Sequence, residues 1–210
     1  MKAKTIRTPF AEACHVSLTI LLTFLLFISN MQTTLATTTT SNNSSQTYQD
    51  YIKIACNSTT YPEICYNSLA SYASTIKTDP QKLCNTALSI TLKAARNESA
   101  LVSAIAKQKG LTSTEKAIVK DCIDNVGDSV DELKQSLKEL EGLQGSDVQF
   151  HMANLKTWVS AAITDEETCT DGFNGNKVNA TVKNKIRNSI LNLAKLTSIS
   201  LALIDNILHY

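Results

Sequence analysis

Apolar residues recur at three- and four-residue steps over most of the chain beyond position 79. This spacing predicts amphipathic α-helices and leaves little room for strands. We expect four long helices, which begin at residues 79, 112 and 146 and after residue 175, with breaks at Gly110, Gly142, Gly145 and Gly175. The expected buried stripes are Leu83, Ala87, Ile90, Ala94, Leu101 and Ile105; Val119, Cys122, Val126, Val130, Leu133, Leu137 and Leu140; Val148, Met152, Leu155, Val159, Ala162, Cys169 and Phe173; and Val182, Ile186, Ile190, Leu193, Leu196, Ser200, Leu203 and Ile207.

Helix-start signals stand at three of these positions. Asp79 is a good N-cap residue, and the proline after it suits the first helical position. Thr112 with Glu115, and Ser146 with Gln149, have the spacing of capping boxes. These residues therefore predict where the first three long helices begin.

A shorter pattern precedes the long helices. Tyr48–Ala73 contains two short apolar stripes, and Pro62 suits the first turn of the second. We expect a helical hairpin over residues 48–78. The connections between the long helices are short, so neighbouring helices must run antiparallel. The prediction is an all-α up-down-up-down four-helix bundle over residues 79–210, preceded by the hairpin.

The first 36 residues are typical of a secretory signal peptide. Lys2, Lys4 and Arg7 are basic, the run Val16–Ile28 is apolar, and small residues place a cleavage site after Ala36. The competing interpretation is a membrane anchor, but the run is shorter than the roughly 20 apolar residues that a bilayer span needs. Residues 37–47 are rich in Thr, Ser and Asn without apolar periodicity, so we expect a flexible leader and a single domain over residues 48–210.

The charge balance argues against two classes of partner. Residues 37–210 contain 17 basic and 18 acidic residues, because the first 36 residues hold three of the 20 basic and one of the 19 acidic residues. The net charge of −1 favours neither nucleic acid nor an anionic membrane, and we predict neither as a partner.

Five cysteines remain after residue 36, and export would place them in an oxidising compartment where disulfides form. Cys122 lies near the start of the second long helix and Cys169 near the end of the third, so antiparallel packing brings them to a similar height and predicts a bridge. Cys56 and Cys65 flank the hairpin turn and are expected to pair. Cys84 is left over, and we interpret it as a small core residue rather than a reactive thiol.

No motif for catalysis, cofactor binding or metal binding occurs. The chain lacks His-Glu-x-x-His, Gly-x-Ser-x-Gly, Gly-x-Gly-x-x-Gly, a P-loop and Cys-x-x-Cys. We therefore predict no enzyme activity, no cofactor and no metal. Acidic residues on the second and third long helices form either a solvated face or a docking face. Five sequons are candidate glycosylation sites, at Asn42, Asn43, Asn57, Asn97 and Asn179.

Three motifs together point to a family. They are Cys56-x8-Cys65 with Tyr61-Pro62, then Lys120-Asp-Cys122-Ile-Asp124, and Trp158-Val-Ser-Ala-Ala-Ile-Thr-Asp-Glu-Glu-Thr-Cys169-x-Asp-Gly-Phe173. In this combination the chain resembles the plant invertase and pectin methylesterase inhibitor family over residues 48–208. The resemblance implies a four-helix bundle with an N-terminal hairpin, in which the first two cysteines pair and the bundle cysteines pair across two helices.

The resemblance leaves two targets open. Invertase inhibitors of the family commonly carry Pro-Lys-Phe before the third bundle helix, where this chain reads Gly145-Ser-Asp-Val-Gln-Phe150. This difference favours pectin methylesterase, with acid invertase as the alternative. Many members also have a tyrosine where this chain has Val126, so a partner contact through a tyrosine side chain is not expected at that position. A storage, lipid-binding or general cell-wall interaction bundle is an alternative from another class.

The resemblance also implies where the partner would bind. Family inhibitors present one side of the bundle to the esterase through the second and third long helices. We expect a secreted protein of the apoplast and cell wall that forms a 1:1 complex covering the active-site cleft of the esterase. The expected contact residues are Asp124, Asp128, Asp131, Glu132 and Thr168.

Overall fold

The structure is a computed structural model that describes residues 43–175 and 177–208. The predicted signal peptide, its cleavage site and residues 37–42 lie outside the described residues. The chain divides into two units, Met1–Thr47 and Tyr48–Tyr210. In the first unit, residues 43–47 are helical, and the flexibility expected of the leader over residues 37–47 stays a prediction. The Thr47 hydroxyl donates to the Asn43 carbonyl one turn earlier, an interaction through which a polar residue is accommodated in a helix.

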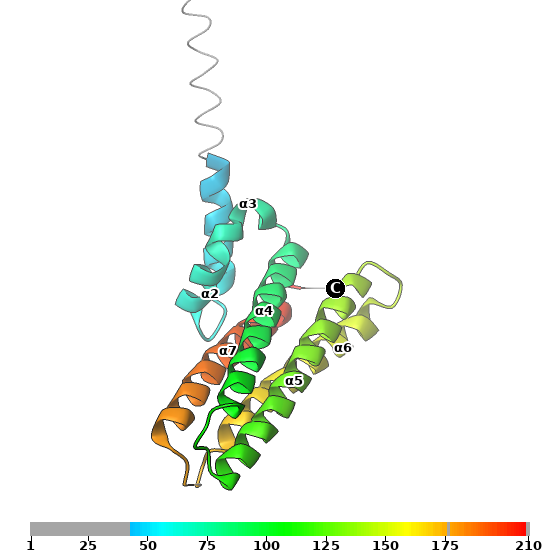
Figure 1. The fold of residues 1–210 in the computed structure, drawn as a ribbon. Coiled ribbons are helices and arrows are strands. Elements are labelled where there is room, and N and C mark those ends of the chain that lie inside the picture. Colours follow the sequence, from blue (N-terminus) through cyan, green and yellow to red (C-terminus); the bar gives the residue numbers. More distant parts are fainter. Residues whose placement is uncertain (1–42, 176, 209–210) are drawn as a thin grey trace, which may run out of the picture. The chain divides into compact units, whose positions relative to one another are not determined.

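Four long antiparallel helices dominate the second unit: α4 (Pro80–Ala106), α5 (Ser113–Gly142), α6 (Val148–Asp171) and α7 (Ala180–Ile207). Helix α5 packs between α4 and α6, and α7 packs against α4 and α6 on the other side, as Figure 1 shows. No strand occurs among the described residues. The predicted all-α four-helix bundle is confirmed.

Two of the three predicted helix starts form as expected. The Asp79 side chain accepts a hydrogen bond from the Lys82 N–H, and Thr112 and Glu115 complete a capping box at the start of α5. The third prediction is wrong, because the N-cap of α6 is Asp147, one residue later than the predicted Ser146. The residue three positions after this cap is Phe150, which has no side-chain acceptor, so no capping box is possible there.

The predicted stripe of α6 is buried almost throughout, whereas α5 and α7 each have two stripe residues that are only half-buried. The difference is larger on α4, where Ile90, Ala94 and Leu101 are only half-buried. Helix α4 contacts α5, α7 and both short helices of the hairpin, so it buries a wider face than one periodic stripe. The buried residues of α4 are Leu83, Cys84, Ala87, Leu88, Thr91, Leu92, Ala95, Val102 and Ile105.

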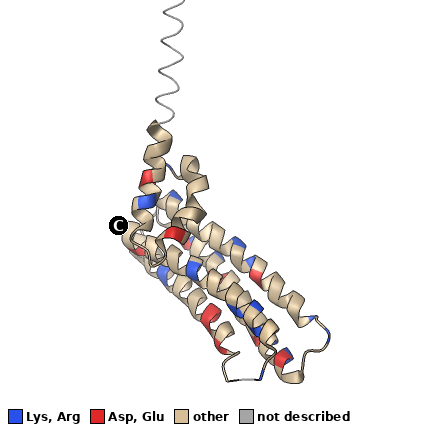
Figure 2. Ribbon diagram, turned by 90° about the vertical axis from the view of Figure 1, so that its left-hand side faces the viewer, with Lys and Arg blue, Asp and Glu red and all other residues tan. Residues whose placement is uncertain are grey.

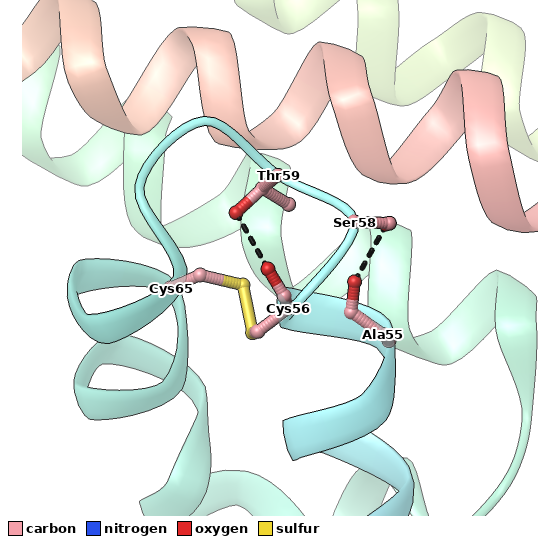
Figure 3. The surroundings of a disulfide bond; sticks show 5 residues. All are labelled: Ala55, Cys56, Ser58, Thr59 and Cys65. Atoms are coloured by element: carbon pink, nitrogen blue, oxygen red, sulfur yellow. Dashed lines mark hydrogen bonds between the residues drawn. A yellow bond between two sulfur atoms is a disulfide. The ribbon is translucent and has the colours of Figure 1, made fainter.

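The N-terminal hairpin consists of helical residues 48–56, α2 (Pro62–Leu69), a 3₁₀ turn η1 (Ala70–Tyr72) and α3 (Ala73–Ile76). Pro62 occupies the first turn of α2, as predicted. Figure 3 shows the Cys56–Cys65 disulfide, whose Cα atoms lie 5.5 Å apart. The Ser58 hydroxyl donates to the Ala55 carbonyl and the Thr59 hydroxyl to the Cys56 carbonyl, which satisfies acceptors at the end of the preceding helix.

Helix α7 is long and apolar enough to cross a membrane, the one such helix among the described residues. Its apolar stripe faces the bundle, where Ile186, Ile190 and Leu203 are fully buried. Packing in a protein core accounts for this composition.

Candidate functional site

A second disulfide joins α5 to α6. The Cα atoms of Cys122 and Cys169 lie 4.3 Å apart, and both side chains are buried. Because 46 residues separate the two cysteines in the chain, the bond fixes the relative height of two helices through a long loop. The face that α5 and α6 share is therefore held in one register.

Four of the five expected contact residues lie on the outer surface of this pair of helices. Asp124, Asp128 and Asp131 are exposed on α5, and Thr168 is exposed on α6. Asp131 accepts a hydrogen bond from Lys134 Nζ at 2.7 Å, and the Thr168 hydroxyl donates to the Thr164 carbonyl of its own helix. We call these four residues, together with Glu132, the acidic face.

Glu132 differs from the other four because it is half-buried between α5 and α6. Burial, together with the negative charge of Asp165 on α6, raises its pKa from 4.5 to about 8. The protonated Glu132 carboxyl donates a hydrogen bond to Asp165, and the pKa of Asp165 is itself raised, chiefly by burial. This carboxyl pair links the acidic face to the interior of the bundle.

Glu166, the next residue on α6, is completely buried. Its Oε1 accepts hydrogen bonds from the Ser129 hydroxyl of α5 at 2.8 Å and the Thr197 hydroxyl of α7 at 2.9 Å. Its Oε2 is buried and has no hydrogen-bond partner among the described residues. Burial raises the pKa of Glu166 to about 7, against the opposing effect of the two hydroxyl donors.

The burial of Glu166 was not predicted from the sequence, because three consecutive acidic residues, Asp165, Glu166 and Glu167, are typical of a solvent-exposed surface. A signal was nevertheless present. Glu166 lies four residues after Ala162 and three before Cys169, so it continues the buried stripe of α6. The helical spacing of position 166 therefore indicates a buried residue, whereas a glutamate is usually exposed.

The described residues contain no group of three His, Cys, Asp or Glu side chains that could hold a metal. A cavity between the hairpin, α4 and α7 has a volume of about 10 Å³, roughly the space of one water molecule, so it is too small for a stored ligand. Acidic and basic positions are scattered over the visible helices in Figure 2, consistent with a near-neutral surface.

Cys84 is fully buried and makes no disulfide. Burial raises the pKa of its thiol to about 12, so the nucleophilic thiolate is scarce at physiological pH. Its side chain packs as a small apolar residue in the core, in line with the interpretation from sequence.

Four of the five sequons lie among the described residues, at Asn43, Asn57, Asn97 and Asn179, and each asparagine is exposed. The Asn179 side chain also caps α7, since its Oδ1 accepts a hydrogen bond from the Thr181 N–H at 2.9 Å. Asn42 lies outside the described residues.

Both the sequence and the fold match known proteins. A family described as plant invertase/pectin methylesterase inhibitor matches residues 50–203. The chain belongs to this family. The domain that defines the family is an enzyme inhibitor and is not itself catalytic.

Relatives within the plant invertase/pectin methylesterase inhibitor family match most of the chain. Pectinesterase inhibitor 4 of Arabidopsis thaliana is 45% identical over 194 residues, which cover 90% of this chain and 96% of that protein. Pectinesterase inhibitor 10 of the same plant is 46% identical over 165 residues, covering 77% of this chain and 52% of that protein. A crystal structure of a mutant form of a pectin methylesterase inhibitor from Arabidopsis has a TM-score of 0.60 at 19% identity, over 74% of this chain and 95% of that one, a likeness in fold.

Proposed function

We propose that this protein is an extracellular inhibitor of a plant pectin methylesterase, secreted to the apoplast and cell wall after removal of residues 1–36. The observation that carries the proposal is the 45% identity to a protein named pectinesterase inhibitor over nearly its whole length. The inhibitor would form a 1:1 complex in which one side of the bundle covers the substrate cleft of the esterase and excludes pectin.

The α5–α6 face is suited to such a role because it is rigid before binding. The Cys122–Cys169 disulfide fixes the two helices relative to each other, and α5 and α6 share the most extensive helix contact of the bundle. A surface that is already ordered loses little conformational entropy when a partner binds, so more of the contact energy contributes to affinity.

Acid invertase is the alternative target. The loop before α6 lacks Pro-Lys, but Phe150 in the first turn of α6 is 63% exposed and is an apolar group that a pocket can receive. The two targets are separated by adding residues 37–210 in slight excess to a pectin methylesterase and to an acid invertase. We expect pectin demethylation to fall and sucrose hydrolysis to persist. The reverse pattern would assign the protein to the invertase branch.

The acidic face is the proposed contact surface, and reversing its charge tests this. The double change Asp124→Lys and Asp128→Lys is expected to weaken inhibition by about tenfold, because each exposed charge contributes roughly 0.2–1 kcal/mol and reversal replaces attraction with repulsion. Both side chains are exposed, so the helical circular dichroism signal should not change.

A matched control reverses two exposed glutamates away from this face, Glu63 on α2 and Glu141 at the end of α5. The change Glu63→Lys with Glu141→Lys alters the net charge equally and should inhibit like the parent. If both double variants inhibit as well as the parent, the acidic face is only solvated and the contact surface lies elsewhere.

A further inference from the structure

The contact between α5 and α6 contains three carboxyl groups that have no basic partner among the described residues. We define the α5–α6 seam by Ser129, Glu132, Asp165 and Glu166. Two carboxylate oxygens in it, Glu132 Oε2 and Glu166 Oε2, are buried and have no hydrogen-bond partner among the described residues. Most buried polar atoms in proteins are hydrogen-bonded, so two such atoms on neighbouring side chains call for an explanation.

The hydrogen bonds of Glu166 show how the seam is built. Hydroxyl donors from α5 and α7 converge on one oxygen, Oε1, and leave the other without a donor. An ionised carboxylate would leave a full charge buried with only one oxygen solvated by the protein, which is costly. A protonated carboxyl group removes that charge while both hydroxyl donors are retained.

Neighbouring negative charges also favour the protonated state of Glu132 and Glu166. The charged groups that act on Glu132 are Asp128 on its own helix and Asp165 and Glu166 on α6. Asp165 and Glu167 act on Glu166. All of them are acidic, so each ionisation in the seam makes the next one less favourable.

We propose that the α5–α6 seam is a proton-operated latch, in which protonated Glu132 and Glu166 hold the two helices together in acidic surroundings and their deprotonation loosens the contact. Protonated Glu132 on α5 faces Asp165 on α6 across the seam. After both protons leave, three carboxylates on α5 and α6 face one another without a counter-ion. The latch concerns the fold itself and does not depend on the proposed inhibitory function.

The sign of the pH effect follows from the raised pKa values. In the unfolded chain both glutamates titrate near 4.5, whereas in the folded protein the pKa of Glu166 is about 7 and that of Glu132 about 8. Between these limits the folded state binds more protons than the unfolded state. The stability that these two glutamates contribute is therefore fully present below pH 4.5 and is lost as the pH rises through 7 to 8.

The size of the effect is bounded by proton linkage. Each carboxyl that stays protonated only in the folded state raises the unfolding equilibrium constant by up to about tenfold per pH unit. Glu166 is completely buried and should approach this limit. Glu132 is half-exposed, so solvent screening reduces its share.

Urea unfolding of residues 37–210 from pH 5 to pH 9 tests the proposal. We expect the unfolding midpoint of the parent to fall steadily up to about pH 8. The changes Glu132→Gln and Glu166→Gln imitate the protonated state, so each should flatten this dependence and their combination should flatten it most. Glu141→Gln, at an exposed position of the same helix, is the control and should keep the slope of the parent.

Carboxyl NMR titration of the unmodified protein gives a second test that needs no variant to fold. Two glutamate side-chain carbons should titrate well above the others, near neutral pH or higher. Parallel pH slopes for the parent and all Gln variants would overturn the proposal. Titration of every glutamate near pH 4 to 5 would overturn it independently. Neither measurement uses an esterase, so failure of the latch is distinguishable from failure of the proposed function.

Discussion

Replacing both Cys122 and Cys169 with serine is expected to lower the free energy of unfolding by about 4 kcal/mol. The bond closes a loop with a sequence separation of 47, and a loop of this length restricts the unfolded chain strongly in the chain-entropy model. The measurement is urea unfolding of the parent and the double variant at one pH below 7. Inhibition should weaken as well, because α5 and α6 would no longer be held in one register.

The hairpin disulfide supplies the control for this prediction. Cys56 and Cys65 are separated by only nine positions, so their replacement by serine should cost less, about 3 kcal/mol. It should also affect inhibition less, because this bond does not join the two helices of the proposed contact face. The account is contradicted if removal of the hairpin bond costs more stability than removal of the bundle bond.

Changing Phe173 to alanine should destabilise the protein by about 3 to 5 kcal/mol, the usual cost of removing a buried aromatic side chain. Phe173 follows α6, is completely buried, and packs in a core cluster with residues of α4, α5 and α7. Its backbone carbonyl also accepts a hydrogen bond from Lys183 Nζ at 3.1 Å, so the residue ties the end of α6 to α7. Thermal unfolding followed by circular dichroism measures the loss.

Phe150 provides a matched control for the same chemical change. It is 63% exposed at the start of α6, so Phe150→Ala should change the free energy of unfolding by no more than about 0.5 kcal/mol. A comparable loss for the two variants would mean that the end of α6 is not packed as described.

The sequence predicted the bundle well because its periodicity and capping chemistry are local and agree with each other. On α5 the capping box of Thr112 and Glu115 starts the helix, and the predicted stripe through Val119, Cys122, Val126 and Leu133 is buried. The Cys122–Cys169 disulfide followed from the same pattern, because antiparallel packing brings the two cysteines to a similar height. Periodicity and capping were sufficient to predict features that depend on a single helix or on one pair of adjacent helices.

Predictions from local sequence were wrong or incomplete where contacts between different helices determined the structure. The N-cap of α6 is Asp147 and not the predicted Ser146. The charge state of Glu166 depends on burial among α5, α6 and α7 and on hydroxyl donors from α5 and α7, which no pattern within α6 encodes. The acidic face was predicted from the family resemblance, and four of its five residues are exposed. The residues that contact an esterase are determined by the surface of the esterase as well as by this chain.

The most direct test of the inhibitory function is titration of a fixed amount of plant pectin methylesterase with residues 37–210. The residual rate of pectin demethylation and the mass of the eluting species by size-exclusion chromatography with light scattering are measured at each ratio. The account predicts that activity falls in proportion to added protein and vanishes near one equivalent, where a 1:1 complex accounts for both proteins. Full activity at several equivalents, with the two proteins eluting separately, would contradict it.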